Sequence, residues 1–124
     1  MEFSTFRQAD EAEIQQLFTE VFTESEGEAE GELIGRLVLE LMRSTEPGDI
    51  FGFVVREQAE IIGGVFFTRL YFNQPVEAFL LSPAAVCSRR QGRGLGQRLL
   101  RYGLEELRKT GVALAFTYGD PAFY

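Results

Sequence analysis

The spacing of hydrophobic positions changes several times along the chain, and each change predicts a new element. Apolar residues recur three and four positions apart in residues 14–22 and again in residues 31–44, which is typical of a helix with one buried face. The apolar runs IFGFVVRE and IIGGVFFTRLYF flank the short connection QAE and predict an antiparallel hairpin. We expect a further strand from about Val76 to Val86, a helix from about Gly94 to Thr110, and a last strand in VALAFTYG.

The N-terminal part predicts a short first strand, FSTFRQA, and then a helix that begins at Asp10. Asp10 and Glu13 have the spacing of a capping box, in which two side chains satisfy N–H groups at a helix start. The acidic, glycine-bearing stretch that follows this helix is expected to be a loop. The second helix should bury one side, made of Leu33, Ile34, Leu37, Val38 and Leu41.

The predicted order is strand, two helices, three strands, helix and strand, which indicates an α/β fold with a mixed sheet. A chain of 124 residues forms one domain, residues 1–124, with a single core. No apolar run approaches the roughly 20 residues that span a bilayer, and the N-terminus lacks the pattern of a secretory signal. The single cysteine suits a reducing compartment, so we expect a cytoplasmic protein without membrane contact.

Charge is distributed unevenly along the chain. The net charge of −7 argues against nucleic acid as a partner. Six acidic residues lie between Glu20 and Glu32, whereas five of the twelve basic residues lie between Arg89 and Arg101. Because the chain has no histidine and one cysteine, we expect no metal cofactor. The two oppositely charged segments suggest that an anion binds near the basic stretch and a cation near the acidic stretch.

The basic stretch CSRRQGRGLGQRLL, residues 87–100, leads from a predicted strand into a predicted helix. The first N–H groups of a helix have no internal partner and carry partial positive charge, so they bind anions, most often phosphate. Glycines let a ligand approach the backbone closely. The stretch has no lysine for a Walker loop, and its G-x-G-x-G spacing differs from the dinucleotide fingerprint. A glycine-rich turn that only caps the helix is the plainer alternative.

The motif from Gln91 to Gly96, QGRGLG, resembles the pyrophosphate loop Q/R-x-x-G-x-G/A of the GNAT superfamily of acetyl-CoA-dependent N-acetyltransferases. The preceding segment LLSPAAVCSRRQGRG and the order of elements also resemble that superfamily. The final GDPAFY is similar to a branch of GNAT proteins whose substrates are mostly unassigned. The resemblance extends over essentially the whole chain and implies a GNAT fold without the usual last two strands.

The resemblance implies where acetyl-CoA would bind. In GNAT proteins the fourth and fifth strands splay apart and the pantetheine arm lies between them. Pro83 lacks an N–H and favours a bulge or an unpaired edge there, although PAAV also fits an ordinary buried strand. The backbone of Ala85, Val86 and Cys87 would pair with pantetheine, and one N–H would polarise the thioester carbonyl. The pyrophosphate would be held by the backbone of Gln91, Gly92, Arg93, Gly94, Leu95, Gly96 and Gln97.

Acetyl transfer to an amine needs a base, because an aliphatic ammonium has a pKa of roughly 10. With no histidine, the candidates are Glu77 or an acid between Glu20 and Glu32, and the sequence does not choose between them. Many GNAT enzymes protonate the leaving thiolate with a tyrosine after the fifth strand. Tyr124 matches that place, although a frayed terminal aromatic fits equally well. Cys87 is expected to be a small buried hydrophobe rather than a nucleophile.

The resemblance therefore implies an N-acetyltransferase in which an amine attacks acetyl-CoA directly. The acidic stretch favours a small cationic amine or a basic peptide N-terminus as acceptor. A non-catalytic acyl-CoA-binding or interaction protein on a shortened GNAT scaffold stays open, and a nucleotide-phosphate binder is a weaker alternative. The fifth strand would be an apolar edge, so a homodimer that covers this edge is a further expectation.

Overall fold

The computed structural model describes residues 1–70, 78–112 and 114–116 of the chain, the last segment through its backbone. Its helices and strands in chain order are β1 (Glu2–Thr5), α1 (Glu11–Glu26), α2 (Glu28–Ser44), β2 (Ile50–Glu57), β3 (Glu60–Leu70), β4 (Ala78–Val86), α3 (Leu95–Lys109) and β5 (Leu114–Phe116). Short 3₁₀ helices cover Gln8–Asp10, Pro47–Asp49 and Ser88–Arg90. The order of strands and helices is the predicted one.

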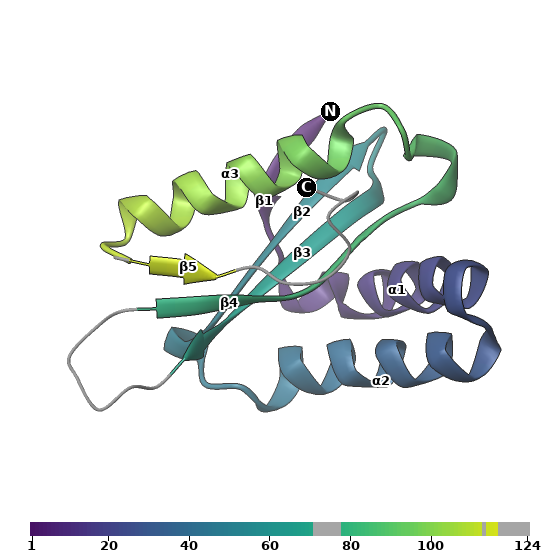
Figure 1. Ribbon diagram of the computed structural model, residues 1–124, viewed down its shortest axis with the longest axis horizontal. Helices are drawn as coiled ribbons and strands as arrows, with labels where there is room; N and C mark the ends of the chain where they lie inside the picture. The colour runs from purple at the N-terminus through teal and green to yellow at the C-terminus, as the bar shows by residue number, and fades with distance from the viewer. Residues whose placement is uncertain (71–77, 113, 117–124) are drawn as a thin grey trace.

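The strands form one mixed sheet in the order β1-β2-β3-β4-β5. The first four strands pair antiparallel with their neighbours, and β5 pairs parallel with Ala78–Leu80 of β4. Helix α3 covers one face of the sheet, and α1 and α2 cover the other (Figure 1). The predicted mixed α/β sheet is confirmed, with β5 at one edge of the described sheet.

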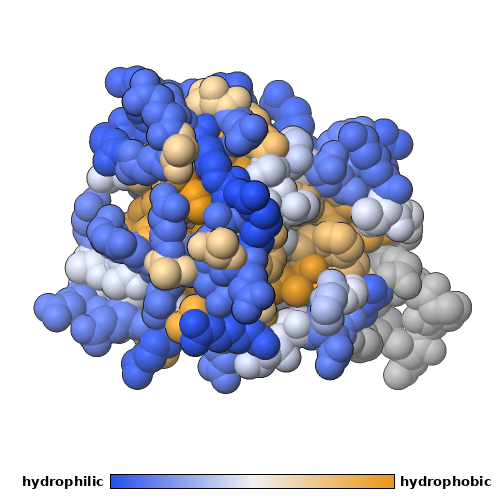
Figure 2. Space-filling view, turned by 180° about the vertical axis from the view of Figure 1, so that it is seen from behind, coloured by the Kyte–Doolittle hydropathy of each residue, from blue (hydrophilic) through white to orange (hydrophobic). Residues whose placement is uncertain are grey.

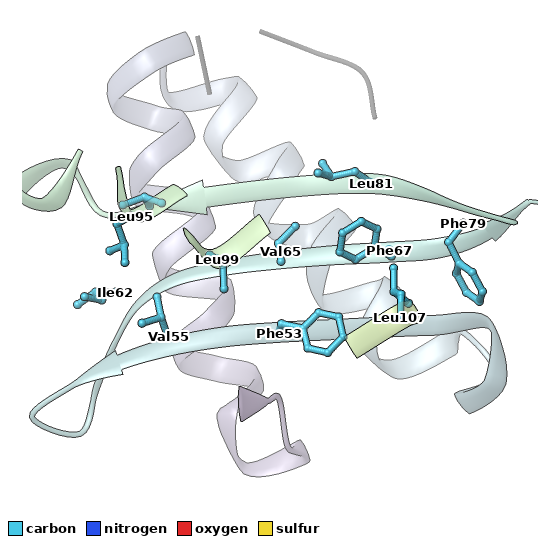
Figure 3. Packing of buried hydrophobic residues seen from close by; sticks show 11 residues of the cluster. Phe53, Val55, Ile62, Val65, Phe67, Phe79, Leu81, Leu95, Leu99 and Leu107 are labelled. Atoms are coloured by element: carbon cyan, nitrogen blue, oxygen red, sulfur yellow. The ribbon is translucent and has the colours of Figure 1, made fainter. Parts of the chain in front are cut away.

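The sheet separates two apolar clusters. On the face covered by α3, Phe53 and Phe67 pack with Leu99 and Leu107 (Figure 3). The cluster on the other face contains Ile14, Phe18, Val38, Val54 and Phe66. Neighbouring residues of β2, such as Phe53 and Val54, belong to opposite clusters because side chains alternate along a strand. Burial on both faces explains why the sequences of β2 and β3 are nearly continuous apolar runs.

The acidic stretch after the first helix is not the predicted loop. Residues 20–32 belong to α1 and α2, except for Gly27, which alone separates the two helices. Gly27 has φ 101°, a conformation that residues with a Cβ rarely adopt, so the chain reverses direction at one residue. Helix α2 consequently begins at Glu28 rather than at Gly31.

The buried side of α2 agrees with the predicted one only in part: Val38 is buried and Ile34 and Leu41 pack against the same cluster, but two of the predicted leucines do not. Leu33 and Leu37 remain 51% and 44% exposed, whereas Gly31, Gly35 and Val38 are buried. The two glycines have no side chain and let α2 approach α1 closely, so they turn the leucines toward solvent. A pattern of apolar side chains does not register this effect, because glycine contributes nothing to it. Seen from behind the view of Figure 1, the surface is mostly hydrophilic, with apolar side chains among the hydrophilic ones (Figure 2).

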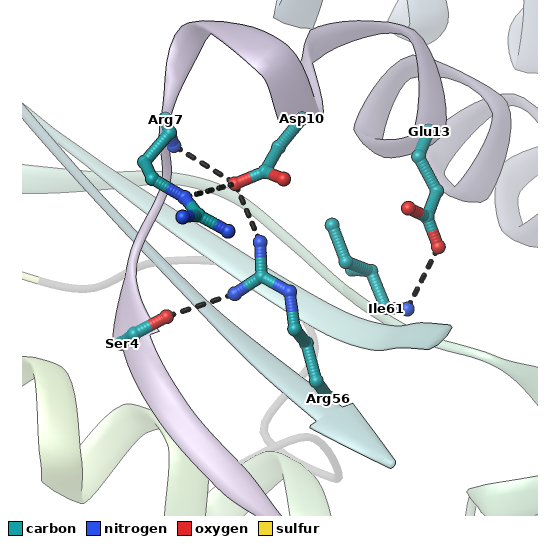
Figure 4. Close-up of polar contacts among 6 residues, drawn as sticks. All are labelled: Ser4, Arg7, Asp10, Glu13, Arg56 and Ile61. Carbon is teal, nitrogen blue, oxygen red and sulfur yellow. Dashed lines mark hydrogen bonds and ion pairs between the residues drawn. The ribbon is translucent and has the colours of Figure 1, made fainter. Parts of the chain in front are cut away.

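The predicted capping box at the start of α1 is wrong. The Asp10 carboxylate accepts a hydrogen bond from the Arg7 N–H at 2.9 Å and forms an ion pair with Arg56 of β2 at 2.5 Å (Figure 4). The Glu13 carboxylate accepts from the Ile61 N–H of β3 at 2.8 Å. The ion pair of Asp10 with β2 and the hydrogen bond of Glu13 with β3 therefore hold the start of α1 against the sheet. The first strand ends at Thr5, and a 3₁₀ helix occupies the residues before α1.

Candidate functional site

Strand β4 contains a bulge at Ser82 and Pro83. Leu81 lies opposite Phe67 of β3, but Ala84 lies opposite Val65, so two residues of β4 face the single residue Phe66. Proline fits here because a bulged residue need not donate an N–H to the ladder. The bulge predicted for Pro83 is confirmed.

The register after the bulge decides which backbone groups point away from β3. The Cys87 N–H donates to the Ile62 carbonyl at 2.9 Å, so these two directly opposed residues form a hydrogen-bonded pair. Bonded and non-bonded pairs alternate in an antiparallel ladder, so Ala85 also bonds toward β3, while the N–H and C=O groups of Ala84 and Val86 face the other side. In the described part of the sheet, β5 reaches only Ala78–Leu80 on that side.

The loop between β4 and α3 presents a row of backbone donors. Gly92 and Gly94 have φ 82° and 75°, and Gly94 caps α3, whose first internal bond runs from the Arg98 N–H to the Gly94 carbonyl at 3.1 Å. No described residue accepts a hydrogen bond from the N–H groups of residues 92–97. A Cβ on Gly92 or Gly94 would meet no protein atom within 4 Å. The space beside these two glycines is therefore open, so an anion has room to approach the donors from that side.

Side chains hold this loop in place. The Gln91 amide donates to the Val86 carbonyl at 2.8 Å, which ties the loop back to the end of β4. Arg89 forms an ion pair with Glu60 at 2.6 Å, and Arg90 pairs with Glu57. The interaction with Glu60 raises the pKa of Arg89, and the charge of Glu20 on α1 adds to that effect. Helix α1 thus places one acid of the acidic stretch within electrostatic range of the loop.

The structure brings the predicted cofactor-binding residues together at the end of β4 and the start of α3. Cys87 is a half-buried free thiol that packs against both apolar clusters. The predicted catalytic residues Glu77 and Tyr124, and the GDPAFY segment, lie outside the described residues. Sequence reasoning did not single out Ala84 or the Gln91 side chain. A bulge at Pro83 shifts the pairing of the residues after it by one position. Taking that shift into account would have indicated that the backbone N–H and C=O of Ala84 point away from β3.

Comparison with known proteins identifies the family. The Acetyltransferase (GNAT) family matches residues 11–122 of the chain. The chain belongs to this family. A GNAT family acetyltransferase from Brucella melitensis in complex with acetyl-CoA is 27% identical with a TM-score of 0.83, covering 96% of this chain and 75% of that chain. The GNAT family N-acetyltransferase YhbS from Escherichia coli in complex with CoA is 27% identical with a TM-score of 0.81, covering 98% and 63%.

Among curated GNAT proteins, the uncharacterized N-acetyltransferase YjhQ of Escherichia coli is 30% identical over 90 residues, which cover 70% of this chain and 50% of YjhQ. The matched part thus spans about half the length of that relative. None of the helices in the described ranges is long and apolar enough to cross a bilayer. Within the same ranges, no three His, Cys, Asp or Glu side chains gather as a metal site would require.

Proposed function

We propose that this GNAT protein is an N-acetyltransferase that uses acetyl-CoA. One observation carries the proposal: the N–H groups of residues 92–97, which have no acceptor among the described residues, lie at the N-terminus of α3, directly after the strand edge that presents Val86. These donors suit a pyrophosphate, and the edge beside them suits an amide-containing arm that pairs like a strand. The acetyl-CoA and CoA complexes of the Brucella and Escherichia proteins support this assignment.

In this proposal the β4 edge holds the pantetheine arm through the outward groups of Ala84 and the Val86 N–H, since the Val86 carbonyl already accepts from the Gln91 amide. The ladder geometry favours these two over Ala85 and Cys87, since the Cys87 N–H already donates to Ile62. An outward N–H at this edge would donate to the thioester carbonyl and stabilise the oxyanion that forms when the amine attacks. A base takes one proton from the ammonium, and the amine nitrogen then bonds to the carbonyl carbon. The carbon–sulfur bond breaks as the nitrogen loses its second proton to solvent or a base, and the leaving thiolate takes up a proton from solvent or an acid.

The acceptor in this proposal is a cationic amine, either small or at a peptide N-terminus. None of the acids between Glu20 and Glu32 forms an ion pair with a described residue, and the charge of Glu20 acts on Arg89 of the loop after β4. We place Glu20 with Glu77 among the candidate bases. Turnover of anionic amines as fast as that of cationic ones would contradict the acceptor class.

The first test is calorimetric titration of acetyl-CoA into the wild type and Gly94→Asp. We expect binding in the wild type and none in the variant, because the aspartate puts a negative charge among the pyrophosphate donors. The matched control is Gly111→Asp after α3, since Gly111 also has positive φ, 90°, and open space around it. Both variants place a side chain at a position with positive φ, but only Gly94→Asp changes the loop.

No binding by the wild type, or equal loss in both variants, would overturn the proposed cofactor site. Binding without transfer to any amine in a screen would instead support the non-catalytic acyl-CoA-binding alternative. Binding that is lost only in Gly94→Asp, together with amine acetylation, would support the whole proposal.

A further inference from the structure

The turn between β2 and β3 has two unfavourable features. Gln58 and Ala59 both have positive φ, 52° and 69°, in a two-residue turn where glycine or asparagine is usual. Glu57 and Glu60 lie directly opposite each other at the ends of the two strands. Like charges in that position destabilise a strand pair. The residues of the turn itself relieve neither feature.

The loop that follows β4 relieves the second feature, the repulsion between the two acids. Glu57 pairs with Arg90, and Glu60 pairs with Arg89 at 2.6 Å, so two adjacent arginines neutralise the two opposed acids. The side chains of Arg90 and Glu57 are 29% and 33% exposed, against 59% and 54% for Arg89 and Glu60. The ion pair of Arg90 with Glu57 is therefore less exposed to solvent and salt than the pair of Arg89 with Glu60, and it should hold the loop more strongly.

Both arginines belong to the 3₁₀ helix Ser88–Arg90, which leads directly into Gln91 and the row of free donors. The Arg90 N–H bonds to the Cys87 carbonyl at 2.9 Å, and Cys87 itself bonds to β3. The 3₁₀ helix is thus fixed at its start by the ladder and at its end by the turn. Because it is held at both ends, the 3₁₀ helix fixes the direction in which residues 91–97 leave the sheet.

We propose that Glu57 and Glu60 are positioning residues for the pyrophosphate-binding loop: through Arg90 and Arg89 they hold the 3₁₀ helix against the β2–β3 turn and so aim the N–H groups of residues 92–97. This inference rests on the proposed function. It also reassigns the arginines, because Arg89 and Arg90 are paired with acids rather than free to attract the anion. Arg93 has no ion-pair partner in the described part of the chain and keeps its charge available.

The sign of the effect separates positioning from simple electrostatics. Replacing either glutamate by glutamine removes a negative charge near a polyanionic cofactor and frees an arginine, so charge alone predicts tighter binding. Loss of positioning predicts weaker binding, because the donors no longer converge on one place.

The experiment measures acetyl-CoA binding by calorimetry for Glu57→Gln and Glu60→Gln. We expect the Kd of Glu57→Gln to rise about fivefold, which corresponds to the loss of one favourable ion pair, and the Kd of Glu60→Gln to rise less. The matched control is Glu105→Gln on α3, which breaks an exposed pair with Arg108 and changes the net charge equally. The control should bind as the wild type does. In turnover assays, the KM for acetyl-CoA should rise while kcat stays unchanged.

A charge swap adds a rescue test. Glu57→Arg combined with Arg90→Glu should recover most of the affinity that either single change loses. Unchanged or tighter binding by Glu57→Gln would overturn the proposal, and so would a swap that behaves as the sum of its two parts.

Amide hydrogen exchange tests the anchoring without the cofactor. The Arg90 and Arg98 N–H groups, which bond within the loop, should exchange faster in Glu57→Gln than in the wild type or Glu105→Gln. If the wild type fails to bind acetyl-CoA, the proposed function fails, but this exchange still decides whether the turn orders the loop. Equal exchange in all three proteins would overturn the positioning role.

Discussion

At the residue scale, Asp10 shows how burial and charge oppose each other. Burial would raise the pKa of its carboxyl group, but the interaction with Arg56, the Arg7 N–H and the two guanidinium charges outweigh burial and hold the pKa below its ordinary value. Arg56 also donates to the Ser4 hydroxyl at 2.9 Å, so this one group connects β1, β2 and the start of α1 (Figure 4). Local spacing cannot locate a partner that lies 46 residues away.

The sign of the resulting pH dependence follows directly. A pKa that is lower in the folded state adds stability above the unfolded-state pKa of about 4, and that stability is lost as the pH falls through the folded-state value. Asp10→Asn should cost about 3 kcal/mol of unfolding free energy near pH 7, because Arg56 is left buried without its counter-charge. Its stability should also fall less steeply than that of the wild type on acidification.

Urea denaturation between pH 7 and pH 2 measures both effects. Glu24→Gln, an exposed change on α1, serves as the control and should follow the wild type. Parallel curves for Asp10→Asn and the wild type would contradict the assigned role of Asp10.

A second residue-scale prediction concerns Glu20. If Glu20 takes the proton from the acceptor, Glu20→Gln should lower kcat by about 10²-fold or more while leaving the Kd for acetyl-CoA nearly unchanged. Glu30→Gln on α2 is the matched control in the same acidic stretch. The measurement is the steady-state rate of each variant with a cationic amine as acceptor. Equal rates in the two variants would contradict the assignment of Glu20 as the base.

At the element scale, the α1–α2 pair depends on two glycines. A Cβ on Gly35 would collide with the Thr19 hydroxyl, and its next neighbours would be the Thr19 Cβ at 3.3 Å and the Gln15 carbonyl at 3.6 Å. A Cβ on Gly31 would collide with the Thr23 hydroxyl and also with backbone atoms of Thr19 and Thr23, both at 2.7 Å. The collision at Gly35 can be relieved by a smaller side chain at residue 19, whereas the collision at Gly31 also involves the backbone of α1.

We therefore expect different rescue behaviour for the two glycines. Gly35→Ala and Gly31→Ala should each destabilise the protein by about 1–3 kcal/mol, against the gain of up to about 1 kcal/mol that alanine gives in a helix. Thr19→Ala should recover most of the loss of Gly35→Ala, but Thr23→Ala should not recover Gly31→Ala. Thermal unfolding of the singles and doubles measures this, and rescue of both would contradict the backbone contact.

The same elements show what a sequence pattern can predict. The order of elements, the hairpin and α3 were predictable because periodic apolar runs face a core there. The loop motif QGRGLG and the bulge at Pro83 were predictable from local chemistry: glycine permits backbone conformations that other residues rarely adopt, and proline fixes φ and has no N–H to donate. The joined helices and the exposed Leu33 and Leu37 were not, because glycine-mediated packing leaves no mark in a pattern of apolar side chains. The ion pairs of Glu57 and Glu60 connect segments about 30 residues apart and leave no local signal either.

At the scale of the whole molecule, the sheet joins two separate apolar clusters into one folding unit. Phe53 and Phe66 are fully buried on opposite faces of the adjacent strands β2 and β3. Both of these strands contribute side chains to each cluster, so neither cluster can unfold while the other keeps β2 and β3 in place.

Phe53→Leu and Phe66→Leu should each lower the unfolding free energy by about 1–2 kcal/mol, because each leaves a small cavity. Both should shift a single transition in urea, followed by far-UV circular dichroism and by fluorescence of the tyrosines. Leu33→Gln is the control and should change the free energy by less than about 0.5 kcal/mol, since Leu33 is exposed. A second transition in either phenylalanine variant would show that the two faces unfold independently.

The extra residue at Ser82–Pro83 also decides which side chains of β4 face α3. Phe79 and Leu81 before it and Val86 after it all join the α3-side cluster, although their numbers differ in parity. Loss of one codon at this place would leave a strand of ordinary length and composition, yet it would send Phe79 and Leu81 to the wrong face. The strand that supplies the proposed cofactor edge therefore tolerates substitution far better than deletion, and natural variation in length should be absent between Leu81 and Val86.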